Sequence, residues 1–302
     1  MSSAALGKRA GRPAWQEPAK PVTKAAKGVA LAFICLLVLV PFLVVISTSL
    51  ASPDEVVANG GWVLWPEHPT LDAYRDIFRG GQVTKAIGVS IGVTLVGTLA
   101  SLVATTLLAY ALSRPQLVGG RKILLGILFT FLFPPGMIPA YLVVKQLGLL
   151  DNYAALIAPV MINVFNLVIV RGFIQGLPEE LFEAARLDGA GEWQVLWRVV
   201  LPLSKAVLAV IGLFYAVSYW NAWFHASIYM SDSKFPIQQV LRMYVIQGAQ
   251  LADPSAADAA AVSAPQTVRM AVVIIAVIPI ILVYPLVQRF FVRGVLTGAI
   301  KS

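Results

Sequence analysis

The sequence predicts an all-α membrane protein with six transmembrane helices. Of its 302 residues, 58% are hydrophobic and 13% are charged, whereas about a quarter of an average soluble domain is charged. Crossing about 30 Å of hydrocarbon as a helix takes roughly 20 apolar residues. Six runs reach or approach that length: residues 28–50, 86–112, 123–144, 154–170, 206–230 and 268–287.

The first run follows a basic segment. Residues 1–27 hold six lysines or arginines and one acidic residue, and their Ala, Gly, Pro and Lys content predicts a disordered tail. The run at 28–50 is longer than the apolar core of a cleaved signal peptide. We therefore interpret it as an uncleaved membrane anchor.

The segment that follows, residues 51–85, is expected to be an outer loop. Leu71, Tyr74, Ile77 and Phe78 share one helical face there, and such a stripe covers the protein's own core, lies at the bilayer surface, or contacts a soluble partner. The second run is rich in small residues that allow close helix packing, so we expect a buried span. These residues are Gly88, Gly92, Gly97, Ala100 and Ser101.

The third run is interrupted at Pro134 and Pro135. Broken backbone at membrane depth is tolerated where it is buried in protein or lines a cavity, so a simple kink and the wall of a substrate path both remain open. The fourth run is short and contains Pro159, Asn163 and Asn166. It is kept as a span because the charge pattern described below requires it.

Residues 176–202, GLPEELFEAARLDGAGEWQVLWRVVLP, form a polar stretch between two apolar runs. Pro178 is suited to a first helical turn, and the glutamates that follow favour the positive end of a helix dipole. Gly189 and Gly191 predict a turn with positive φ before a second helix over 192–200. On these features alone, the stretch could be a simple amphipathic loop between spans.

The basic residues favour one orientation. With the N-terminus inside, sixteen of the 23 lysines and arginines fall in inner segments, so the positive-inside rule places both termini and residues 176–202 in the cytoplasm. Residues 289–302 then form a cytoplasmic tail. This dispersed basic charge does not resemble a nucleic-acid-binding patch.

The fifth run ends in an aromatic cluster. Aromatic rings at this depth form either a belt at the outer interface or a surface on which sugar rings pack. The candidate path residues are Tyr219, Trp220, Asn221 and Trp223, together with Pro134 and Pro135. The outer loop that follows is of low complexity over residues 251–266 and is expected to be mobile.

Several chemistries find no support in the sequence. Cys35 is the only cysteine, and His68 and His225 are the only histidines, so neither disulfides nor a Cys/His metal site is expected. There is no GxxxxGK[ST] loop, and apart from Arg269 the apolar runs carry no charge that would indicate ion coupling. A secondary transporter or channel, and a membrane enzyme, remain as less favoured alternatives.

The motif Glu183-Ala184-Ala185, with Gly189 and Leu201-Pro202 at the following spacing, resembles the EAA loop of the membrane subunits of bacterial binding-protein-dependent ABC importers. Val199 stands where that family usually has Ile. The stretches LGLLDNYAALI and FYAVSYWNAWF and the ending FVRGVLTGAIK resemble the maltose-type carbohydrate class, especially a subgroup associated with complex oligosaccharides such as uronate oligomers.

The resemblance implies a type I ABC importer permease fold with a core over residues 86–288 and a cytoplasmic coupling-helix loop. The loop residues implied in ATPase coupling are Glu183, Ala184, Ala185, Asp188, Gly189, Leu201 and Pro202. Such a chain is a transport subunit of the bacterial plasma membrane that works by alternating access and is not an enzyme.

The resemblance also implies the partners. These are a second permease subunit, expected to be a different chain, two ATPase subunits, an extracytoplasmic sugar-binding protein and membrane lipids, without nucleic acid. ATP and Mg²⁺ would be bound by the ATPase subunits, so no cofactor is expected in this chain.

Overall fold

The computed structural model describes residues 21–79, 81–246 and 265–298, and every regular element within these ranges is a helix. The first part contains α1 (Pro21–Leu50), α2 (Pro53–Ala58), α3 (Asp72–Arg79), α4 (Gln82–Ser113), α5 (Gly120–Leu132), α6 (Met137–Gln146), α7 (Ala154–Ile157), the 3₁₀ turn η1 (Ala158–Val160) and α8 (Val164–Gln175). The second contains α9 (Glu179–Leu187), α10 (Glu192–Val195), the π-helical turn η2 (Leu196–Val200), α11 (Leu201–Leu203), α12 (Lys205–Trp220), α13 (Trp223–Tyr229), the 3₁₀ turn η3 (Asp232–Lys234), α14 (Ile237–Ile246) and α15 (Pro265–Gly298).

Three of the described helices, α1, α4 and α15, are long and apolar enough to cross a membrane by themselves. Three further pairs qualify only when taken together, because each is bent: α5 with α6 by 117°, α7–η1 with α8 by 54°, and α10–α11 with α12 by 81°. The predicted all-helical class is confirmed. The predicted six spans are reached when each bent pair is counted as one span.

Several helix boundaries differ from those expected from hydropathy. Helix α1 begins at Pro21 rather than at residue 28, because the good helix formers Lys24, Ala25, Ala26 and Lys27 extend it into the segment that was expected to be disordered. The fifth run is interrupted after Trp220, and α15 continues to Gly298, into the expected tail. Residues 1–20, most of the predicted mobile loop 251–266, and residues 299–302 lie outside the described ranges.

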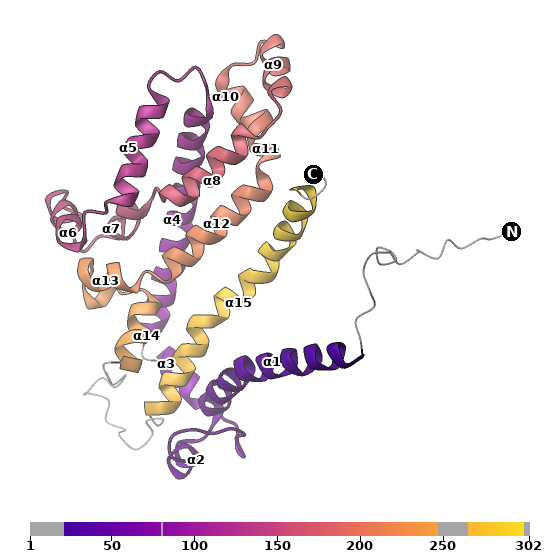
Figure 1. Cartoon of the computed structure of the whole chain (residues 1–302). Helices are drawn as coiled ribbons and strands as arrows, with labels where there is room; N and C mark the ends of the chain where they lie inside the picture. The colour runs from indigo at the N-terminus through magenta and orange to yellow at the C-terminus, as the bar shows by residue number, and fades with distance from the viewer. Residues whose placement is uncertain (1–20, 80, 247–264, 299–302) are drawn as a thin grey trace.

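Helix α4 is the centre of the fold, with α8 and α12 packed along it (Figure 1). One side of α4 is buried along its whole length, at positions separated by three or four residues: Val83, Ala86, Ser90, Val93, Gly97, Ser101, Thr105, Ala109 and Leu112. Two buried hydroxyl pairs join it to α12, Ser101 with Tyr219 and Thr105 with Tyr215, each at 2.7 Å. These bonds fix the register of the two helices.

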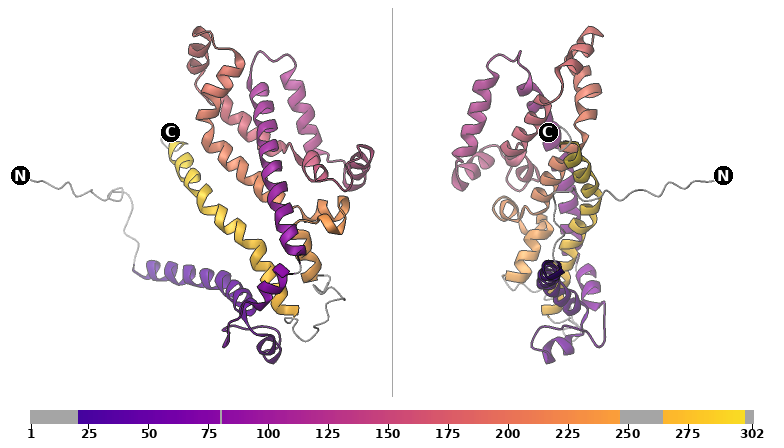
Figure 2. Two further views of the ribbon diagram at one scale, coloured as in Figure 1. Left: turned by 180° about the vertical axis from the view of Figure 1, so that it is seen from behind. Right: turned by 45° about the vertical axis from the view of Figure 1, so that its right-hand side comes forward.

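The two ends of the molecule carry different elements. Figure 1 shows α9 and α10 at the end where the chain turns from α4 into α5, with α2, α3 and α14 at the opposite end. Figure 2 shows α1 projecting away from the other helices, and none of its most apolar 18-residue window is buried. The segments 113–122 and 176–202, which the charge pattern assigned to the inner side, therefore lie at one end of the structure, and the 51–85 segment lies at the other.

The stripe predicted in the first outer loop is divided in the structure. Ile77 is fully buried, and the hydroxyl of Tyr74 is hydrogen-bonded to that of Ser49 at 2.8 Å. Leu71 and Phe78 are 56% and 50% exposed. Helix α3 thus covers the protein's own core with half of the stripe and leaves the other half uncovered.

The small residues of α4 also fall into two groups. A Cβ added at Gly97 would lie 2.8 Å from the Tyr219 ring, whereas Gly88 and Gly92 face open space. Close packing therefore requires glycine at Gly97, and the predicted burial of this span holds for one side of the helix only.

We expect Gly97→Ala to lower stability by about 1–3 kcal/mol, because the added methyl overlaps a ring whose hydroxyl is already bonded to Ser101. The matched control is Gly92→Ala, which adds the same methyl to the open side of the same helix. Thermal unfolding of the purified protein in detergent measures both. Equal melting temperatures for the two variants would contradict the packing described for α4.

Candidate functional site

Residues 176–202, called here the 176–202 loop, fold into two short helices joined by a turn. Helix α9 begins at Glu179 with Pro178 as its N-cap, which confirms the predicted start. Glu179 lies in its first turn and Arg186 in its last, where each charge complements the helix dipole. Arg186 approaches the carboxylates of Glu179 at 4.0 Å and Glu192 at 3.9 Å, and so connects the two helices.

The turn between α9 and α10 depends on one glycine in the left-handed region rather than two. Gly189 has φ 76°, as predicted. Gly191 has φ −73° and is the N-cap of α10, where its N–H donates to the Gln194 side chain at 3.1 Å. The prediction of positive φ at Gly191 is wrong, because this residue ends the turn by starting the next helix.

One face of the loop is buried against the rest of the chain. Phe182 is 2% exposed, and Ala185 packs partly on the core. Leu201 also contacts the core, and Pro202 lies beside it in a surface groove of about 590 Å³ that Trp197 and Leu102 help to line. Of the implied loop residues, Ala185 and Leu201 therefore have a role in attachment.

The opposite face of the loop is exposed. It contains Glu183, Ala184, Asp188 and Gly189. Three large apolar side chains lie in the same loop: Leu187 is 89% exposed, Trp193 65% and Trp197 66%. Sequence reasoning missed these three, although two tryptophans four residues apart in a polar stretch were a usable signal. Apolar and aromatic groups surrounded by charge are typical of a protein-binding surface.

The aromatic candidates do not form a single site. Tyr219 and Trp220 are 2% and 6% exposed, and the indole N–H of Trp220 donates to the carbonyl of Ala276 at 3.1 Å. Asn221 is exposed, and its amide donates to the carbonyl of Val217 at 2.8 Å. Tyr219 and Trp220 thus pack within this chain and have their polar atoms already bonded.

The remaining path candidates are accessible. The Arg242 guanidinium lies 3.8 Å from the centre of the Trp223 ring, a stacked arrangement that leaves only one ring face free. Pro134 and Pro135 are exposed between α5 and α6, at the 117° bend. Trp223 lies in α13 and the two prolines lie in the connection between α5 and α6, so these candidates come from separate segments of the chain.

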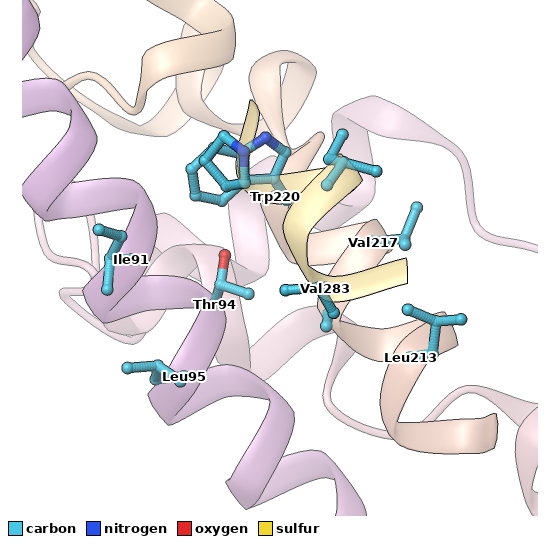
Figure 3. A pocket seen from close by; sticks show the side chains of 10 residues that line it. Ile91, Thr94, Leu95, Leu213, Val217, Trp220 and Val283 are labelled. Atoms are coloured by element: carbon cyan, nitrogen blue, oxygen red, sulfur yellow. The ribbon is translucent and has the colours of Figure 1, made fainter. Parts of the chain in front are cut away.

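A pocket of about 190 Å³ lies between α4, α12 and α15 (Figure 3). Its walls are apolar apart from the hydroxyl of Thr94 and the edge of Trp220, and they include Leu95 and Val283. A sugar needs many hydrogen-bonding partners, so this pocket does not have the lining of a saccharide site. Nor do the described residues contain a group of three or more potential metal ligands.

A charged cluster joins the segment after α6 to the segment after α13. Asp151 has a left-handed backbone, φ 56°, and its carboxylate accepts hydrogen bonds from the backbone and hydroxyl of Ser231, at 3.0 and 2.7 Å. The Lys234 ammonium lies 2.7 Å from the same carboxylate. Lys234 first, and then Ser231, lower the pKa of Asp151 from 3.8 to about 2.

The sequence profile of the family described as the binding-protein-dependent transport system inner membrane component matches residues 119–297. The chain belongs to this family. The match runs from the residue before α5 almost to the end of α15 and so contains the whole 176–202 loop. The protein is therefore a permease of an ABC importer, a multi-pass inner membrane component that acts in transport and not as an enzyme.

Relatives extend this result over nearly the whole chain. The polygalacturonan/rhamnogalacturonan transport system permease protein YtcP of Bacillus subtilis is 44% identical over 90% of this chain and 94% of its own. Protein LplC of the same organism is 46% identical over 87% and 90%. The crystal structure of a bacterial ABC transporter involved in the import of the acidic polysaccharide alginate matches with a TM-score of 0.84 at 31% identity, covering 92% of this chain and 99% of that one.

The Asp151 cluster gives a pH prediction. Folding depresses the pKa of Asp151, so the ionised carboxylate stabilises the folded protein. This stabilisation is complete above about pH 3.8 and is lost as the pH falls through about 2. Asp151→Asn removes the charge and still tolerates the left-handed backbone. We expect the wild-type melting temperature to exceed that of Asp151→Asn at about pH 6 and the gap to close between about pH 4 and pH 2.

The control is Asp232→Asn, an exposed acidic residue in the neighbouring η3 turn. It should produce no pH-dependent gap over the same range. A gap for Asp151→Asn that stayed constant with pH would show that the carboxylate charge is not what holds the cluster.

Proposed function

We propose that this permease moves an acidic oligosaccharide, of the uronate-containing type, across the bacterial plasma membrane by alternating access, and that separate ATPase subunits drive it through the 176–202 loop. The observation that carries the coupling part is the geometry of that loop. Its inner face is fixed by Phe182, Ala185 and Leu201, while Glu183, Asp188 and Leu187 project outward.

The outward face has the chemistry of a docking surface. The small Ala184 permits close approach of another chain, and the carboxylates of Glu183 and Asp188 suit a basic partner surface. Leu187 supplies apolar area at the turn that Gly189 fixes, and Trp193 adds to it from α10. We expect the ATPase subunit to cover these residues and to bind ATP and Mg²⁺ itself.

The substrate class follows from the relatives rather than from a pocket. Two of them are named for acidic saccharides, polygalacturonan with rhamnogalacturonan in one case and alginate in the other. A second alginate transporter structure contains an alginate pentasaccharide-bound periplasmic protein. We therefore expect an extracytoplasmic binding protein to deliver the sugar to the end formed by α2, α3 and α14, with both termini of this chain in the cytoplasm.

The second permease subunit, expected to be a different chain, would complete the substrate path. Within the path, Trp223 and Asn221 near the end of α12, and Pro134 and Pro135 at the α5–α6 bend, remain the candidates with accessible atoms. Tyr219 and Trp220 support α12 against α4 and α15. We assign these two to positioning the path rather than to sugar contact.

Glu183→Gln should weaken binding of the ATPase subunit roughly ten- to a hundredfold, because a hydrogen bond to a charged group contributes about 1.5–3 kcal/mol. Glu67→Gln, the same change at the opposite end of the molecule, serves as the control. Co-purification with the ATPase subunit, and ATP-dependent uptake of a short galacturonate oligomer into proteoliposomes, measure the effect.

Three results would each contradict part of the proposal. Normal ATPase binding and uptake in Glu183→Gln would remove the role of the loop. Uptake by the purified chain alone, driven by an ion gradient, would favour a secondary transporter. Uptake of neutral maltose-type oligomers in place of galacturonate oligomers would overturn the substrate class and leave the coupling intact.

A further inference from the structure

Arg114 joins the end of α4 to both helices of the 176–202 loop. It is the C-cap residue of α4, and its side chain is only 10% exposed. Its guanidinium carbon lies 4.0 Å from the centre of the Phe182 ring, which belongs to α9. Its Nε lies 3.4 Å from the carboxylate of Glu192, the first residue of α10. A single side chain thus contacts both halves of the loop.

Tyr110, one turn before Arg114, completes the connection. Its hydroxyl accepts a hydrogen bond from Arg114 Nη2 at 2.9 Å and donates to the Glu192 carboxylate. The backbone carbonyl of Glu192 lies 3.2 Å from the same hydroxyl. The start of α10 is therefore held by two residues of α4, through side chain and backbone together.

The chemistry of this cluster requires a guanidinium. Its carbon lies 4.6 Å from the Tyr110 ring as well as 4.0 Å from that of Phe182, so the planar group lies over two aromatic rings while Nη2 donates to a hydroxyl and the charge forms an ion pair with a carboxylate. A lysine ammonium is a compact, strongly hydrated charge and cannot make all four contacts. A buried charge that loses its partners is strongly destabilising.

We infer that Arg114 is a positioning residue that fixes α9 and α10 to α4, so that a displacement of the loop reaches the helices of the permease core. This inference rests on the proposed function, in which the ATPase subunit acts on the loop. Helix α4 can pass the displacement on, because the Thr105–Tyr215 pair links it to α12 and the Tyr215 hydroxyl accepts the N–H of Asn163, before α8. Arg114 lies outside the EAA motif.

The test uses the whole complex, with the second permease, the ATPase subunits and the binding protein, in proteoliposomes. The measured quantity is the amount of galacturonate oligomer taken up per ATP hydrolysed. We expect Arg114→Lys to lower this ratio at least about fivefold, the lower end of typical coupling between sites. The matched control is Arg121→Gln, a cation removed from the exposed start of α5, which should leave the ratio unchanged.

Hydrogen exchange on the isolated permease supplies a second readout that needs neither sugar nor ATPase. Arg114→Lys should speed exchange of backbone amides in both α9 and α10 and leave α8 as in the wild type. Glu192→Gln, which removes one contact only, should speed exchange mainly in α10. This second variant keeps the inference testable if Arg114→Lys yields too little folded protein.

The outcomes separate this inference from the proposed function. If Glu183→Gln abolishes ATPase binding while Arg114→Lys keeps the wild-type ratio and exchange, the loop docks the ATPase and Arg114 does not position it. If Arg114→Lys speeds exchange in both loop helices while Glu183→Gln has no effect on the complex, the attachment is real but the proposed function fails. A fall in the ratio together with faster exchange in both helices supports the inference.

Discussion

The packing of α4 against its neighbours is the constraint on which the rest of the structure depends. On its buried side, α4 approaches α12 closely at one glycine, Gly97, and through two hydroxyl pairs, those of Ser101 and Thr105. Inside hydrocarbon such polar pairs have no water to replace them. The helices that carry the loop at one end and the aromatic cluster towards the other are therefore held in one register relative to each other.

Much of this arrangement could be predicted from local sequence. Helix content, the start of α9 directly after Pro178 and the left-handed turn at Gly189 follow from capping and backbone rules that act within a few residues. The 176–202 loop was identified because its charge interrupts apolar runs. These features need no knowledge of what packs against them.

Other features depend on contacts between distant segments and could not be predicted. The sequence placed Tyr219 and Trp220 among path candidates, but Ser101 and Ala276, far away in the chain, take up their polar atoms. Likewise Gly191 was expected to resemble Gly189, whereas the start of α10 sets its conformation. Arg114 belongs to no recognisable motif. Its contacts with Phe182 and Glu192 form only when the folded chain brings these distant residues together.

The 81° bend between α10–α11 and α12 has a mechanical consequence. A push along the axis of the first segment arrives at α12 almost entirely as a sideways thrust, because the two axes are nearly perpendicular. The bend falls at Ser204, between α11 and α12. It directly follows Pro202, which has no N–H to donate, and the π-helical turn at Leu196–Val200. In the proposed function, a displacement of α10–α11 along its own axis would therefore move α12 sideways rather than along its length.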